Sequence, residues 1–182
     1  MGSRYHSNHA AFTRRAIMAG AALALVAAAW AAPVGAKEIV GTPGDDILIG
    51  TPGDDVIDGR GGNDIIKGRG GNDVLRGGAG RDIIYGEAGD DRVKGGSGAD
   101  VLVGGDGDDV VIGGRHDDTL YGDAGDDRLV GRAGSDTMRG GADDDYLVAD
   151  DGEADVVRGG KGQDLVEMDG GLDLVFSAWA VH

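Results

Sequence analysis

The sequence predicts an all-β protein built from tandem repeats, and three observations support this. First, 38 of the 182 residues are Gly. Second, 29 of the 33 acidic residues are Asp, and Asp with Gly favours turns, because both tolerate positive φ and Asp hydrogen-bonds its own backbone. Third, residues 41–176 divide into units of nine, each with an aliphatic residue near its end. Such a short fixed period is typical of a solenoid, in which stacked units bury one continuous core.

The composition excludes several classes of protein. The formal net charge is −16, so the chain repels phosphates and lacks the basic surface that nucleic-acid binding needs. The absence of Cys excludes a disulfide framework and a thiolate zinc site. The high Gly content disfavours an ordinary globular domain, because ordering Gly costs more backbone entropy than ordering other residues.

Residues 1–36 differ from the rest of the chain and predict a secretory signal-peptide helix. They contain three Arg residues and no acidic residue, and residues 16–32 are almost wholly apolar. Small residues follow Pro33 up to Ala36, as at a signal-peptidase site. The mature protein is therefore expected to begin at Lys37 and to be secreted, either into the extracellular space or into a periplasm, without a membrane anchor.

Residues 1–36 fit two export routes, and a membrane anchor is the alternative to a cleaved signal. Residues 13–18, TRRAIM, resemble a twin-arginine export signal, and an ordinary Sec signal fits the same residues equally well. An apolar run of seventeen residues dominated by Ala is short and weakly hydrophobic for a membrane span, so cleavage is favoured.

The repeat array occupies residues 41–176, with residues 37–40 as a short lead-in and residues 177–182 as a C-terminal tail. Twelve nine-residue units run without a gap over residues 41–148, one unit at 149–158 carries an extra residue, and two more cover 159–176. The array therefore has fifteen units.

Two positions of the unit define the repeat. The sixth position is always Asp, at Asp46, Asp55, Asp64, Asp73, Asp82, Asp91, Asp100, Asp109, Asp118, Asp127, Asp136, Asp145, Asp155, Asp164 and Asp173. The eighth position is always aliphatic or Met, at Leu48, Ile57, Ile66, Leu75, Ile84, Val93, Leu102, Val111, Leu120, Leu129, Met138, Leu147, Val157, Val166 and Val175.

Each part of the unit indicates a local structure. Residues such as Ile65-Ile66-Lys67 predict a three-residue strand with the middle side chain pointing inward. The six residues before them predict a turn, in which Gly at the first, second and fourth positions permits positive φ and lets carbonyl oxygens approach one point. Asp adds carboxylate oxygen. Clustered oxygens in a flexible turn suit a hard cation, and Ca²⁺ better than Mg²⁺.

These units resemble the haemolysin-type calcium-binding, or repeats-in-toxin (RTX), nonapeptide G-G-x-G-x-D-x-U-x. The resemblance implies a right-handed parallel β-roll with two units per coil, in which each Ca²⁺ lies between the turns of units i and i+2. It implies ligands from the sixth-position Asp of both turns and from backbone carbonyls of their first four residues. The glycines implied as carbonyl ligands are Gly59, Gly61, Gly62, Gly68, Gly70, Gly71, Gly77, Gly80, Gly86, Gly89, Gly95, Gly98, Gly104 and Gly107.

Calcium is expected to be required for folding. Stacked Asp columns repel one another, and a chain of low hydrophobicity and high net charge is disordered until cations reverse that repulsion. Fifteen units allow thirteen i/i+2 pairs, so about thirteen ions is the upper limit.

Several positions depart from the repeat. His116 and Asp143 replace the fourth-position Gly, Met168 replaces a first-position Gly, and the extra residue near Asp150 and Asp151 widens a turn. We expect these changes to weaken individual sites. The alternative for His116 is a pH-sensitive or transition-metal ligand, which a lone His among carboxylates supports weakly. Acids at the fifth position are interpreted as a solvated rim that concentrates cations, at Asp45, Asp54, Asp90 and Asp108.

The predicted function is that of a secreted calcium-binding structural or binding module, not an enzyme. The few Ser and His residues after residue 36 form no catalytic motif, and carboxylates in a calcium ladder are ionised rather than poised as general acids. The alternative is an auxiliary module that assists secretion or folding of a separately encoded exported enzyme. An adhesive or ice-binding solenoid would need a Thr ladder, and only Thr119 and Thr137 recur on one face.

A candidate partner surface follows from the alternation of units. If consecutive units belong to opposite sheets, odd units place an apolar row outward, near Ile65, Ile83, Tyr85 and Val101. Exposed apolar strips often mark interfaces, although β-propensity alone also selects aliphatic residues in strands. We therefore predict that this odd-unit sheet packs on another copy or on a protein partner.

Overall fold

The computed structural model describes residues 36–169 and 173–176, and this part of the chain is all-β. The predicted signal-peptide helix and the C-terminal tail lie outside the described residues. Within the described part, no helix is long and apolar enough to cross a membrane.

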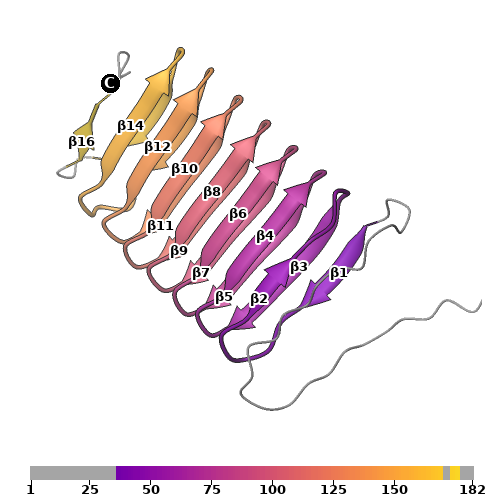
Figure 1. Cartoon of the computed structure of the whole chain (residues 1–182). Coiled ribbons are helices and arrows are strands. Elements are labelled where there is room, and N and C mark those ends of the chain that lie inside the picture. The colour runs from indigo at the N-terminus through magenta and orange to yellow at the C-terminus, as the bar shows by residue number, and fades with distance from the viewer. Residues whose placement is uncertain (1–35, 170–172, 177–182) are drawn as a thin grey trace, which may run out of the picture.

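Two parallel sheets of eight strands face each other along the whole array (Figure 1). The even-unit sheet takes its name from the repeats that supply seven of its strands. In order along the sheet it contains β1 (Lys37–Val40), β3 (Asp55–Gly61), β5 (Val74–Ala79), β7 (Arg92–Ser97), β9 (Val110–Arg115), β11 (Arg128–Ala133), β13 (Tyr146–Ala149) and β15 (Leu165–Met168). The odd-unit sheet contains β2 (Ile47–Ile49), β4 (Ile65–Gly70), β6 (Ile83–Ala88), β8 (Val101–Asp106), β10 (Thr119–Ala124), β12 (Thr137–Ala142), β14 (Val156–Lys161) and β16 (Leu174–Val175).

The register confirms two units per coil. Ile65 pairs with Ile83, and Ile83 pairs with Val101, so each residue lies beside the one eighteen positions later. Past the extra residue the offset becomes nineteen, as between Thr137 and Val156, and the pairing continues. The predicted parallel β-roll is therefore present, and it includes units beyond the insertion.

The strands are longer than predicted. Most have six residues, such as β6, because the ladder continues into the first three residues of the next unit. The sequence predicts turns at those residues, but units i and i+2 stack in register around the bend, so their backbone groups pair there too. The lead-in also forms a strand: β1 pairs with β3 and buries Ile39. No turn motif precedes it, so the nine-residue pattern could not reveal it.

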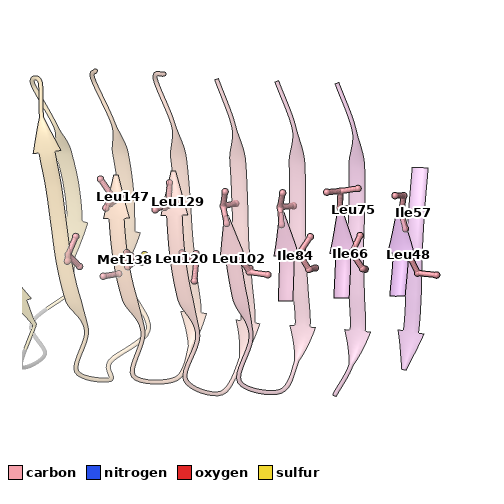
Figure 2. Packing of buried hydrophobic residues seen from close by; sticks show 14 of the residues in the cluster. Leu48, Ile57, Ile66, Leu75, Ile84, Leu102, Leu120, Leu129, Met138 and Leu147 are labelled. Carbon is pink, nitrogen blue, oxygen red and sulfur yellow. The ribbon is translucent and has the colours of Figure 1, made fainter. Parts of the chain in front are cut away.

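A single file of side chains from each sheet forms the core (Figure 2). Fourteen of the fifteen eighth-position side chains are buried, and Val175 in β16 is partly buried against them. Each coil thus contributes one inward side chain per sheet, and each contacts mainly its neighbours along the roll. The turns that join the sheets run along two edges. The odd edge carries the turns of odd units, and the even edge carries those of even units.

Candidate metal sites in the turns

The sixth-position Asp side chains form two buried rows, one along each edge. Each of the first fourteen is at most 4% exposed, although all but Asp55, the first residue of β3, lie in the turns that join the two sheets. Burial of a carboxylate is costly unless each oxygen finds a partner, so the surroundings of both oxygens decide what these rows do.

One carboxylate oxygen is satisfied by the backbone. The Oδ1 atom of Asp82 accepts the backbone N–H of Asp64, one coil earlier, at 2.8 Å. The same bond joins successive Asp residues along both edges, and across the insertion Asp155 Oδ1 accepts the N–H of Asp136 at 2.7 Å. From Asp55 onward these bonds fix the orientation of the carboxylate, and the second oxygen faces the gap toward the next coil where a next coil is present.

The second oxygen has no hydrogen-bond partner within the described residues in most units. Buried polar atoms are rarely left unpaired, and an ion is one of the explanations for a set of them. The unpaired atoms are the Oδ2 atoms of Asp64, Asp73, Asp82, Asp91, Asp100, Asp109, Asp118, Asp127, Asp136, Asp145, Asp155 and Asp173.

Backbone carbonyls complete the lining of these gaps. A Cβ at Gly113 would lie 2.5 Å from Asp118 Oδ2 and 2.8 Å from the carbonyl oxygen of Gly131, one coil later. The first-position Gly is therefore required for space, because the carboxylate and the carbonyl converge beside it. The Asp carboxylate crowds the predicted site glycines in the same way at Gly59, Gly68, Gly77, Gly86, Gly95 and Gly104, and the later carbonyl oxygen also lies beside Gly59, Gly68 and Gly86.

The prediction of positive φ was wrong for the first position and correct for the fourth. From unit 3 to unit 12 the second and fourth positions adopt positive φ, as in Arg60 at 76° and Gly62 at 103°, whereas in units 1 and 2 neither position does. The second position accepts other residues in this conformation, at a cost of order 1 kcal/mol each. The fourth-position site glycines are Gly62, Gly71, Gly80, Gly89, Gly98 and Gly107, whereas Gly61 and Gly70 occupy the third position, where a Cβ meets only ordinary contacts.

The departures from the repeat keep the architecture. His116 and Asp143 take φ values of 76° and 78°, so the left-handed turn persists without Gly. At the insertion, Asp151 accepts the N–H of Gly134 at 3.1 Å through its side chain, where other coils use a third-position carbonyl. Met168 ends β15 and packs against the core. None of these changes breaks the Asp ladder.

The fifth position is more than a solvated rim. Its side-chain oxygen accepts the backbone N–H of the fifth residue one coil later, as Asp54 does from Asn72 at 2.9 Å. On the even edge this outer ladder continues without a break through Asp90, Asp108, Asp126 and Asp144 to Gln163. Sequence reasoning missed it, although the recurrence of Asp or Asn at the fifth position every eighteen residues was visible.

Burial dominates the electrostatics of the inner rows. It raises the pKa of the carboxyls from Asp64 to Asp155, the N–H bond from the previous coil opposes the shift, and neighbouring Asp charges add to it in most of these units. The pKa rises to about 7 for Asp73, Asp100, Asp127, Asp136 and Asp145, and to about 6 for Asp64, Asp91, Asp109, Asp118 and Asp155. Such carboxylates gain strongly from a cation beside the unpaired oxygen.

The donor set fits a hard cation. Within the described residues, no group of three or more His, Cys, Asp or Glu side chains is placed to hold one ion together. The gaps instead present a carboxylate oxygen, joined in several of them by a backbone carbonyl oxygen of the next coil, and both are ligands of Ca²⁺ in flexible turns. The chain has no Cys, so thiolate donors, which would favour zinc or copper, are absent.

The fold and its oxygen-lined turns define a cation-binding parallel β-solenoid. The chain matches the RTX calcium-binding nonapeptide repeat in four overlapping copies, at residues 40–75, 67–102, 94–129 and 121–153. These copies cover more than half of the chain, which therefore belongs to this family and carries a calcium-binding β-roll, as the repeat pattern predicted. No curated protein matches the chain.

Proposed function

We propose that this chain is an exported structural or binding module that folds when calcium enters the gaps between its turns. The observation that carries the proposal is the row of buried, unpaired Oδ2 atoms along both edges. Without a cation those carboxylates are unfavourable in the folded state, and with one they become ligands. Calcium concentration thus becomes a condition for folding.

The residues have distinct tasks in this proposal. The sixth-position Asp residues from Asp64 to Asp155 offer an unpaired Oδ2 to the gap, and the Oδ1 bond to the previous coil, such as that of Asp100 to Asp82, holds this oxygen in place. First-position glycines leave room and direct carbonyls into the same gap. Calcium supplies the positive charge that offsets the stacked carboxylates.

Export supports this dependence on calcium. The composition of residues 1–36 favours a cleaved signal peptide, and calcium modules outside the cell have affinities of about 10⁻⁴–10⁻³ M. Such affinity keeps the chain unfolded in the cytosol and lets it fold after export.

Circular dichroism of residues 37–182 during a calcium titration, combined with ion counting, tests the proposal. We expect cooperative appearance of strand signal in the high micromolar to millimolar range, and little response to Mg²⁺ at the same concentration. Full strand content in excess chelator would contradict it.

A partner surface is supported by the register of the odd-unit sheet. Ile47, Ile65, Ile83 and Val101 form one row, and Tyr85 pairs with Val103 in the row beside it. The side chains of this row are only partly buried. We propose that a second copy packs on this face, because a flat apolar row is self-complementary in an antiparallel dimer.

Charge on this face tests the dimer. Ile83→Lys combined with Val101→Lys should shift the sedimentation coefficient to that of a monomer in saturating calcium. The matched control, Val56→Lys with Val74→Lys on the even-unit sheet, should not. Equal sedimentation of both variants and the parent would contradict the dimer.

The alternative function is that of an auxiliary module for a separately encoded enzyme. Two measurements test this alternative and the proposal that the chain itself is not catalytic. Affinity capture with and without calcium would reveal a catalytic partner as a calcium-dependent companion. A hydrolytic activity retained by the purified roll would overturn the non-enzymatic assignment.

A further inference from the structure

The first two repeats differ from all later ones in their second and third residues. Units 1 and 2 carry Thr42-Pro43 and Thr51-Pro52, whereas units 3 and 4 carry Arg-Gly at the same place. These are also the only prolines within the repeat array.

In these two turns the second carboxylate oxygen has partners. Asp46 Oδ2 accepts the backbone N–H of Thr42 at 2.5 Å and its hydroxyl at 3.0 Å. The same hydroxyl accepts the N–H of Gly44 at 3.2 Å. Asp55 Oδ2 is bound in the same way by the N–H and hydroxyl of Thr51. Asp46 and Asp55 therefore lack the unpaired oxygen found in the later units.

Proline explains this difference. A residue before Pro is restricted to extended backbone, and neither Thr42 nor Thr51 has positive φ. At the same place Arg60 and Arg69 take φ of 76° and 89°, and the N–H of Arg60 points instead to Asp58 Oδ1, at 3.1 Å. In the Thr-Pro turns the backbone N–H and the hydroxyl of Thr therefore both donate to the carboxylate. In the Arg-Gly turns neither residue donates to it.

The bound oxygen is the one that faces the gap. A Cβ at Gly41 would lie 2.8 Å from Asp46 Oδ2 and 2.7 Å from the carbonyl oxygen of Gly59, one coil later. The Thr hydrogens at this oxygen compete with a cation for its lone pairs. We propose that Thr42 and Thr51 close the first gap on each edge to calcium, so that the first coil is a metal-independent cap on a calcium-loaded roll.

The number of available gaps follows. The array has thirteen gaps between units i and i+2. If the first two are closed, eleven remain, and these begin at units 3 to 13. The described residues contain twelve unpaired Oδ2 atoms, and one of them, in Asp173, belongs to the last unit, which has no later turn to face. The remaining eleven atoms coincide with the eleven gaps. A terminal repeat that differs from the interior ones is the usual way to end a solenoid.

This inference rests on the proposed calcium binding, and carboxamide substitutions test it separately. Asp46→Asn with Asp55→Asn should leave the number of bound ions, measured by equilibrium dialysis with radioactive calcium, equal to that of the parent. The matched control, Asp82→Asn with Asp91→Asn, should bind about two fewer. A loss of about two ions in the first variant would overturn the cap. A parent that binds no calcium would overturn the proposed function instead.

Exchanging the turns gives the reciprocal test. Arg60→Thr with Gly61→Pro in unit 3 should remove about one ion from the count. Replacing Thr42-Pro43 and Thr51-Pro52 by Arg-Gly should add up to two ions. In the parent, slow hydrogen exchange of the Thr42 and Thr51 amides in saturating calcium is expected. Unchanged counts after exchange, or rapid exchange of both amides, would overturn the inference.

Discussion

A single Asp of the inner row does two things at once. Asp82 accepts the N–H of Asp64 with Oδ1 and directs Oδ2 into the gap between units 5 and 7. Asp45, in the fifth position, accepts the N–H of Asn63 at 2.6 Å but lies on the exposed side of the turn. The two positions should therefore respond differently to substitution.

Asp82→Ala removes a ladder bond and a ligand. We expect the calcium midpoint to rise on the order of tenfold, with one ion fewer, because one hydrogen bond contributes about 1 kcal/mol and the ligand is lost as well. Asp45→Ala should cost about 1 kcal/mol of stability without changing the ion count. Calorimetric titration and ion counting measure both. Equal loss of ions in the two variants would show that the sixth position is not the ligand.

The raised pKa values predict a dependence on pH in the metal-free chain. Burial raises the pKa of Asp73, Asp127 and Asp136 to about 7, above the 3.8 of the free side chain. The folded state then binds more protons than the unfolded state, so its stability is greatest below pH 3.8 and declines as pH rises to about 7. In chelator, strand signal by circular dichroism should increase from pH 8 to pH 4. A signal independent of pH would contradict this.

The roles of individual residues differ in how far the sequence alone predicts them. The inner Asp row was predictable because one residue type recurs at every unit. The roles of the glycines were only partly predictable, because crowding at the first position depends on the carbonyl of a residue eighteen positions away, such as Gly131 beside Gly113. The Thr-Pro turns were visible in the sequence, but the hydrogen bond from Thr42 to Asp46 required the actual path of the backbone.

At the scale of elements, the turn with the extra residue shows how a defect is absorbed. Fourth-position N–H groups in other coils donate to a third-position carbonyl, as Gly107 does to Ala124 at 2.8 Å. In the widened turn the carboxylate of Asp151, itself the third residue of its unit, accepts the N–H of Gly134 instead. Register is thereby kept on both sides of the insertion, and β12 still pairs with β14.

Asp151→Ala should loosen this turn locally. The Gly134 amide loses its acceptor, so its hydrogen exchange should accelerate about five- to tenfold, for a bond worth about 1 kcal/mol. The matched control is Glu153→Ala, whose exposed side chain belongs to the same turn. The measurement is the hydrogen-exchange rate of the Gly134 amide by NMR in saturating calcium. Equal exchange rates in the two variants would contradict the role of Asp151.

On the scale of the whole molecule, the roll is a one-dimensional stack. Each core layer holds one side chain per sheet, and each coil is bonded to the coils before and after it (Figure 2). The nine-residue period predicted this stack, but the lead-in strand β1 lies outside the period and became visible only through its pairing with β3. A stack of this kind tolerates removal of whole layers, because stability is close to a sum of repeat and neighbour terms.

Deletions of different length should therefore have different effects. Deleting residues 86–103 removes one coil, brings residues 68–85 against residues 104–121 in the same register, and should leave a folded roll with about two fewer ions. Deleting residues 86–94 removes one unit and moves every later unit to the opposite sheet. The eighth-position core survives this exchange, but the outer ladder on the even edge is broken, because Ala99 then follows Asn72.

Thermal unfolding in saturating calcium distinguishes the two deletions. The coil deletion should keep a single cooperative transition near that of the parent. The unit deletion should melt several degrees lower, since the loss of a few outer hydrogen bonds of about 1 kcal/mol each shifts the midpoint of a domain this size by about 2–4 °C per kcal/mol. If removing a whole coil unfolds the protein as completely as removing half of one, the roll depends on a feature of residues 86–103 that their repeat pattern does not contain.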